Sequence, residues 1–183
     1  MMSPSFRFIR ALAVGSVVVL QAQHYTRSVH KYAPPSVRLL DTTGRPVRFD
    51  ALLDTPDPVV LQFIFTSCTT ICPILTATLA AAQDQFGPGV RLISISIDPE
   101  NDTPARLAQY AARFRAHKDW IFLTGAQKDV TAVQRAFDAE DNGKMNHRPV
   151  TFLRAAAIGR WVRLEGLTST AELVGEYHRA AAP

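Results

Sequence analysis

The pattern of hydrophobic and polar positions predicts alternating strands and helices over most of the chain. Residues 59–65, Val-Val-Leu-Gln-Phe-Ile-Phe, are almost entirely apolar and rich in strand-forming residues, as expected of a central strand covered on both faces. A helix follows, predicted by apolar residues at helical spacing: Leu75, Leu79, Ala82 and Phe86. The rest of the chain predicts strand, helix, strand, helix, strand, strand and helix over residues 90–97, 104–114, 120–123, 127–137, 150–153, 161–164 and 169–179.

Shorter signals refine this order of elements. Residues 36–40 and 46–49 flank a turn sequence containing Gly44, which predicts a short β-hairpin. Thr103 and Pro104 predict the start of a helix, as its N-cap and its first residue. A βαβ core followed by a β-hairpin and a last helix belongs to the α/β class. We therefore predict a thioredoxin-like fold with a central mixed β-sheet flanked by helices.

The first 22 residues have a different character. Arg7 and Arg10 precede the apolar residues 11–20, and this order is typical of a signal peptide. Counted from residue 6 to residue 22, the segment also has nearly the length of about 20 residues that spans a bilayer. We expect residues 1–22 to act as a signal peptide or membrane anchor. The protein is then exported, to the bacterial periplasm or to the periplasmic side of the inner membrane.

Composition agrees with one folded domain after this segment. Residues 23–35 are polar and contain prolines, so they predict a tether. Residues 36–183 remain for a domain of about 150 residues, which is large enough to bury a core. The chain carries a formal net charge of +4 at pH 7. Its lysines and arginines are scattered along the sequence, and we therefore predict no nucleic-acid partner.

Both cysteines lie in one short run, Cys68-Thr-Thr-Ile-Cys72-Pro73, between the central strand and the helix after it. Pro73 disfavours helical geometry at Cys72, which predicts a helix that begins near Pro73 with both sulfurs around its N-terminal end. Unpaired N–H groups and the helix dipole favour anions there, so we expect the pKa of both thiols to lie below about 8.5. The pair is suited either to disulfide chemistry or to binding a soft metal ion.

A third donor for a metal is His147, which lies just ahead of the strand predicted over residues 150–153. Cu(I) accepts two thiolates and one imidazole, and two thiolates also balance the charge of Cu(II). Zinc usually takes four protein ligands, or three with water, so copper fits this donor set better than zinc. A simple thioredoxin is disfavoured because three residues, not two, separate the cysteines. A peroxiredoxin is disfavoured because Phe65 and Leu61 stand where its threonine and proline belong.

These motifs resemble those of the SCO/SenC family, over roughly residues 36–177. The resemblance rests on residues 65–73, on residues 96–104 with Asp98 and Asp102, and on His147. The family consists of thioredoxin-fold copper proteins, exported or anchored in a membrane, that are linked to cytochrome c oxidase assembly. The resemblance therefore implies that Cys68, Cys72 and His147 bind copper. It also implies, as partner, the copper-receiving subunit of a respiratory enzyme.

The chain departs from the family pattern beside the cysteines. Thr69 and Thr70 stand where family members usually carry Pro and Asp, so an acidic neighbour of the copper loop is missing. Pro149 falls where thioredoxin folds often place a cis-proline, which predicts a cis bond between Arg148 and Pro149. Met145 brings a further soft sulfur close to His147, although a packing or exposed role is more common for methionine.

Three functions follow as hypotheses. The favoured one is a metallochaperone, not a turnover enzyme, in which thiolate exchange passes Cu(I) between partners. The second is an exported thiol-disulfide reductase, in which Cys68 and Cys72 form the catalytic redox pair and act on other thiol proteins. The third is a redox or copper sensor. Asp98 and Asp102 are expected to hold their loop and cap the helix at Thr103, without binding metal.

Overall fold

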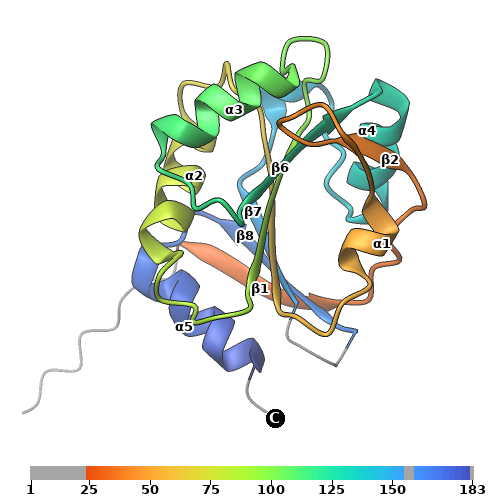
Figure 1. Ribbon diagram of the computed structural model, residues 1–183. Coiled ribbons are helices and arrows are strands. Elements are labelled where there is room, and N and C mark those ends of the chain that lie inside the picture. Colours follow the sequence, from red (N-terminus) through yellow and green to blue (C-terminus); the bar gives the residue numbers. More distant parts are fainter. Residues whose placement is uncertain (1–23, 155–158, 182–183) are drawn as a thin grey trace, which may run out of the picture.

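A mixed sheet runs through the middle of the molecule, with helices against both faces (Figure 1). The computed structural model describes residues 24–154 and 159–181. Their strands are β1 Tyr25–His30, β2 Arg38–Leu40, β3 Pro46–Arg48, β4 Val59–Ile64, β5 Arg91–Ser96, β6 Ile121–Gly125, β7 Val150–Arg154 and β8 Trp161–Gly166. They lie in the order β1-β8-β7-β4-β5-β6-β2-β3. β4, β5 and β6 are parallel, whereas β7, β8 and β1 form an antiparallel group on the other side of β4.

The helices divide between the two faces of the sheet. They are α1 Phe49–Leu53, α2 Ile71–Ala82, α3 Pro104–Arg113, α4 Gln127–Ala136 and α5 Thr170–Ala181, with a 3-10 turn η1 at Lys144–Asn146. Figure 1 shows α2, α3 and α5 on one face and α1 and α4 on the other. Because α2 and α3 connect successive parallel strands in the same direction, right-handed crossovers place both on one face. α4 leads the chain back across the sheet to β7 and lies on the opposite face.

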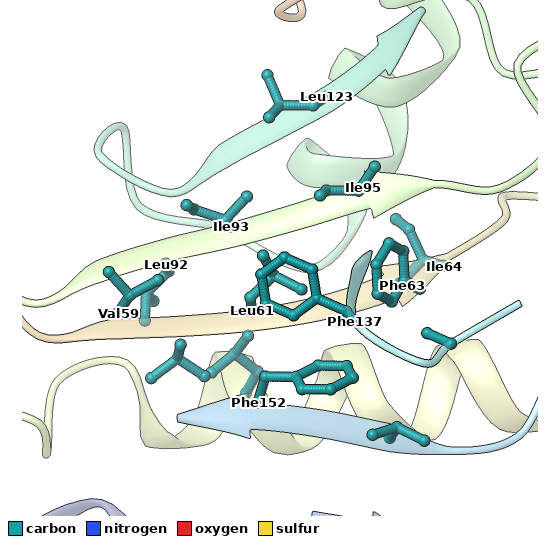
Figure 2. Close-up of a cluster of buried hydrophobic side chains, with 14 of the residues drawn as sticks. Val59, Leu61, Phe63, Ile64, Leu92, Ile93, Ile95, Leu123, Phe137 and Phe152 are labelled. Atoms are coloured by element: carbon teal, nitrogen blue, oxygen red, sulfur yellow. The ribbon is translucent and has the colours of Figure 1, made fainter. Parts of the chain in front are cut away.

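The core is built around β4, whose six residues are all buried. Aromatic rings pack over this strand, with centroids 6.0 Å apart for Phe63 and Phe152 and 5.3 Å apart for Phe137 and Phe152. Figure 2 shows these rings among the aliphatic side chains of β4 and β5. Burial on both faces explains the continuous apolar run in the sequence and confirms the prediction of a central strand.

The predicted thioredoxin-like α/β fold is confirmed. The hairpin expected over residues 36–40 and 46–49 is the antiparallel pair β2 and β3. Thr103 caps α3 as predicted, because its hydroxyl oxygen accepts the backbone N–H of Arg106 at 3.3 Å while Pro104 occupies the first turn. The remaining predicted elements match observed ones to within a few residues.

The predicted tether contains a strand that the sequence analysis missed. Residues 25–30 form β1, which pairs with β8 in antiparallel register from Tyr25 opposite Gly166 to His30 opposite Trp161. Most residues of β1 are exposed and most of these are polar, so the sequence of this strand cannot be told from that of a linker. The predicted signal peptide or anchor, residues 1–22, lies outside the described residues. Among the residues that the structure describes, no helix is sufficiently long and apolar to span a membrane.

A buried carboxylate joins β1 to α5. Glu176 is 1% exposed, and it accepts hydrogen bonds from the Tyr25 hydroxyl and the Arg27 Nε, both at 2.8 Å. The guanidinium of Arg179 donates to the same carboxylate. A buried charge with three donors is fully compensated, so this network fixes the edge strand to the domain.

Removing this carboxylate tests whether β1 belongs to the folded domain. In Glu176→Ala the buried Tyr25 hydroxyl loses its acceptor, and we expect the free energy of unfolding to fall by about 2 kcal/mol. Denaturant titration measures the change. Glu140→Ala, which breaks an exposed ion pair with Arg135, is the matched control and leaves the unfolding midpoint unchanged. A wild-type midpoint in Glu176→Ala contradicts a stabilising role for the network.

Candidate metal centre

The two cysteines lie where β4 gives way to α2. Cys68 is in the connecting loop, and Cys72 is the second residue of α2, which begins at Ile71 with Thr70 as N-cap. The helix thus starts two residues before the predicted start at Pro73. A proline in the first turn is tolerated because its nitrogen needs no intrahelical partner there. Both sulfurs still lie around the N-terminal end of the helix, since the Cys72 backbone N–H donates to Cys68 Sγ at 3.4 Å.

The two thiols differ in exposure and therefore in acidity. Both are free, Cys68 is half-buried and Cys72 is fully buried. Partial burial opposes a charge on Cys68, but hydrogen bonds from the backbone N–H groups of Cys72 and Thr70 outweigh it, so the pKa of Cys68 is lowered. Burial raises the pKa of Cys72 to about 12, and the neighbouring Cys68 adds to this. The expected low pKa is thus found for Cys68 and is wrong for Cys72, because loss of solvent outweighs the helix N-terminus.

His147 reaches the same region from the segment between η1 and β7. Its ring is almost completely buried, and Nε2 lies 3.1 Å from the backbone oxygen of Phe63, the penultimate residue of β4. Burial lowers the pKa of His147, and the Phe63 hydrogen bond and the Asp141 carboxylate oppose this without reversing it. The ring is therefore neutral near pH 7. A carbonyl oxygen can only accept, so Nε2 carries the proton and Nδ1 keeps its lone pair.

The free lone pair on Nδ1 has no hydrogen-bond partner although the atom is buried. The nearest carboxylate oxygen, of Asp141, lies 3.5 Å away. A neutral imidazole nitrogen with an unused lone pair is the form in which histidine binds metals. His147 therefore has a donor atom that the folded chain does not use.

One pocket of about 110 Å³ brings the two halves of the candidate site together. Cys68 lines it with its loop neighbours, and Met145 and His147 line it from the η1 side. The ring of Phe65 packs edge-on against His147, with centroids 6.5 Å apart. Cys72 lies buried beside the pocket and does not line it. Within the described residues no three side chains of His, Cys, Asp or Glu stand close enough together to hold a metal ion. The predicted triad is thus gathered in one region without forming a closed ligand set.

Comparison with known proteins decides the family. Residues 29–176 match the sequence model of the SCO1/SenC family. The chain belongs to the SCO1/SenC family. It is 29% identical over 154 residues to an SCO2-like protein of Rickettsia conorii, covering 77% of this chain and 73% of that protein. It is 48% identical over 68 residues to the SCO1 homologue of Bacillus subtilis, covering 35% of each.

The match to several relatives is partial. The aligned segment covers 35% of the Bacillus subtilis protein and 24% of a mitochondrial SCO1 homologue of Arabidopsis thaliana. Solved structures are covered more completely. Copper-bound ScoI of Arabidopsis thaliana superposes with a TM-score of 0.68 at 26% identity, over 82% of this chain and 98% of that one. BsSco, a Sco-family cytochrome c oxidase assembly protein with a disulfide switch, gives 0.67 at 26% identity, over 82% and 94%.

The SCO1/SenC protein supports its cysteine loop with a buried carboxylate. Asp102 is fully buried and accepts the backbone N–H of Thr66 at 2.9 Å, the Thr66 hydroxyl at 2.5 Å and the Ser96 hydroxyl at 2.6 Å. Sequence reasoning assigned Asp102 a structural role within its own loop but missed this contact with the residue that follows Phe65. No local pattern in the sequence indicates this contact. Thr66 follows β4 and Asp102 follows β5, and the two loops come together because these strands are paired in parallel.

Asp98 supports the histidine side of the site. Its carboxylate accepts the Asn101 side-chain amide within its own loop, as expected, and also Lys144 Nζ at 2.7 Å. Lys144 begins η1, the turn that precedes His147. The two carboxylates of one loop therefore hold the two halves of the site in place, Asp102 the cysteine loop and Asp98 the histidine segment.

The predicted cis bond before Pro149 is wrong. All peptide bonds among the described residues are trans. The Arg148 backbone N–H and its guanidinium both donate to Asp141, and the guanidinium also reaches Glu165 at 2.9 Å. The Pro149 carbonyl accepts the backbone N–H of Gly166. These contacts hold the chain on its path into β7 with the trans bond, which is the lower-energy form.

The unequal thiols predict selective alkylation. Cys68 should react with iodoacetamide in the folded protein, while the buried, protonated Cys72 stays unmodified. Because the pKa of Cys68 is lowered, its reaction rate should reach half-maximum at a lower pH than the rate of a cysteine in an unstructured peptide. Mass spectrometry of timed samples reads out both sites. Cys68→Ser should abolish modification and Cys72→Ser should preserve it; the reverse order of reactivity refutes the assignment.

The loop support by Asp102 predicts a large loss of stability on truncation. Asp102→Ala leaves three buried or half-buried donors without an acceptor, and we expect the free energy of unfolding to fall by about 3 kcal/mol. Asp102→Asn keeps one acceptor oxygen and should lose clearly less. Asp119→Ala, at an exposed position, serves as control. Denaturation curves that coincide for the alanine variant and wild type would show that Asp102 does not hold the loop.

Proposed function

We propose that this SCO1/SenC protein is a copper metallochaperone that binds its cargo through Cys68, Cys72 and His147. The observation that carries the proposal is the shared pocket: Cys68 and His147 line it from segments far apart in sequence, and the Cys72 backbone N–H contacts Cys68 Sγ. Two sulfurs and a neutral imidazole are a soft donor set that suits Cu(I), and two thiolates also suit Cu(II). A hard cation would find no carboxylate among the residues lining this pocket.

Binding requires a proton to leave Cys72, whereas His147 already has a nitrogen with a free lone pair. A thiol must lose its proton before its sulfur binds a metal, so copper binding displaces the proton of buried Cys72. His147 has Nδ1 free as a donor, and its Nε2–H is held by the Phe63 carbonyl, which fixes the tautomer. Copper would therefore bind as a soft Lewis acid to side chains that the fold already orients.

The open arrangement supports a carrier role. Cys68 is half-buried, so a ligand of a partner can approach an ion bound to it. Transfer is then a ligand exchange, in which a bond from copper to a partner's sulfur forms as a bond to Cys68 breaks, with no electron transferred. A fully enclosed set of ligands would hold the ion too firmly for such exchange.

The receiving partner is proposed from the relatives. ScoI of Arabidopsis thaliana has been solved with copper bound, and BsSco belongs to cytochrome c oxidase assembly proteins. We infer that this chain delivers copper to a respiratory copper enzyme such as cytochrome c oxidase, or keeps the cysteines of that enzyme reduced. Residues 1–22 would export it, as signal peptide or membrane anchor, to the periplasmic side.

The thiol-disulfide reductase hypothesis has one observation in its favour. An accessible, acidic Cys68 beside a buried Cys72 resembles an attacking and a resolving thiol. This hypothesis gives no task to His147, whose Nδ1 is buried without a hydrogen-bond partner. The sensor hypothesis has no separate support among the described residues.

Copper titration separates the two hypotheses. The reduced full-length protein should bind one copper ion per chain, and Cu(II) should give a thiolate-to-metal charge-transfer band. His147→Ala and Cys72→Ser should each weaken binding by at least about tenfold, because each removes one ligand. His117→Ala removes an exposed histidine and should bind as wild type. The proposal fails if His147→Ala binds copper with wild-type affinity. If the His147→Ala variant also reduces disulfides at the wild-type rate, the reductase function is supported instead.

A further inference from the structure

Met145 is an exposed thioether at the mouth of the candidate copper pocket. Its side chain is 83% exposed, and it lines the same pocket as Cys68 and His147. A methionine this exposed contributes little to the core. Cys72 and His147 are, by contrast, 0% and 6% exposed. Of the soft donors around the site, Cys68 and Met145 are therefore the two that an arriving ion meets first.

The backbone that carries Met145 is held on both sides. Lys144 Nζ binds Asp98 Oδ2 at 2.7 Å, and the Asn146 side-chain amide donates to the Asn142 carbonyl at 2.7 Å. Within the turn, the His147 backbone N–H donates to the Lys144 carbonyl. The backbone position of Met145 beside the pocket is thus fixed by its neighbours, while its side chain is left exposed to solvent.

The chemistry of a thioether suits transient capture of copper. Thioether sulfur is a soft ligand that favours Cu(I), and it carries no proton that must leave first. It is a neutral donor and so a weaker ligand than a thiolate, which allows it to be replaced. A hard or borderline ion gains little from it.

We propose that Cys68 and Met145 form a capture site for Cu(I), from which the ion passes to Cys72 and His147. This inference rests on the proposed copper-carrying function. Bonds from copper to Cys68 Sγ and Met145 Sδ form while bonds to the donor's ligands break. Bonds from copper to Cys72 Sγ and His147 Nδ1 then form as the bond to Met145 Sδ breaks, the bond to Cys68 Sγ is kept, and the Cys72 proton leaves to solvent. Copper stays Cu(I) in both steps, so no oxidant or reductant is needed.

An alternative role for Met145 is an apolar contact with a partner protein. Ile74, in the first turn of α2, is also a large apolar residue with an exposed side chain, at 48%. Met145→Leu separates the two roles, because leucine keeps the apolar character and nearly the volume of methionine but has no sulfur. Since residue 145 is exposed, the substitution should leave stability unchanged.

Methionine-methyl NMR of the reduced full-length protein tests capture directly. The chain has three methionines, Met1, Met2 and Met145, so the first two act as internal references. In Cys72→Ser/His147→Ala, one equivalent of Cu(I) should shift the Met145 methyl resonance alone. Adding Met145→Leu to this double variant should weaken Cu(I) binding by about tenfold, since it removes one of two remaining ligands.

A kinetic measurement in an otherwise unaltered chain keeps the test independent of the double variant. Met145→Leu should take up Cu(I) from a chelator several-fold more slowly, with little change in final affinity, whereas Ile74→Ala should match wild type. An unmoved Met145 methyl resonance, or wild-type uptake by Met145→Leu, overturns the capture site. Failure of the wild-type protein to bind copper would instead refute the metallochaperone function.

Discussion

The candidate site depends on one constraint, the burial of β4 on both faces of the sheet. All six residues of the strand are buried, and backbone pairing to β5 and β7 holds it on both sides. The chain therefore leaves β4 from a fixed point, and Asp102 immediately holds Thr66 by its backbone and its hydroxyl. The cysteine loop starts from rigid support, and His147 is bound to the same strand through the Phe63 carbonyl.

Solvent exposure divides the soft donors into two classes. Cys68 and Met145 are accessible, whereas Cys72 and His147 are enclosed by protein. Cys72 keeps a proton that a metal would displace, and His147 keeps a free lone pair on Nδ1. A carrier must hold its ion and also release it, and such a division meets both needs. In the proposed copper carrier, the enclosed donors would supply affinity, and the accessible ones would give donor and acceptor proteins a place to exchange ligands.

The sequence predicted elements best where burial is regular. β4 and α2 were recognisable because their apolar residues follow the period of the element. β1 was not, because an edge strand that exposes most of its residues has the composition of a linker. The pKa of Cys72 was also misjudged: the helix N-terminus is a local feature, while desolvation of the thiol depends on what packs over it.

By itself, the sequence determined the order of most elements, the α/β fold class and the residue types able to bind a soft metal, with Cys68, Cys72 and His147 as candidates. These follow from periodicity and side-chain chemistry, which are local properties. Only the tertiary structure decided that Cys68 and His147 share a pocket, that Cys72 is buried beside it, and that Asp98 and Asp102 each hold one half. Distances between remote segments and access of solvent arise from packing, and packing is absent from any local pattern.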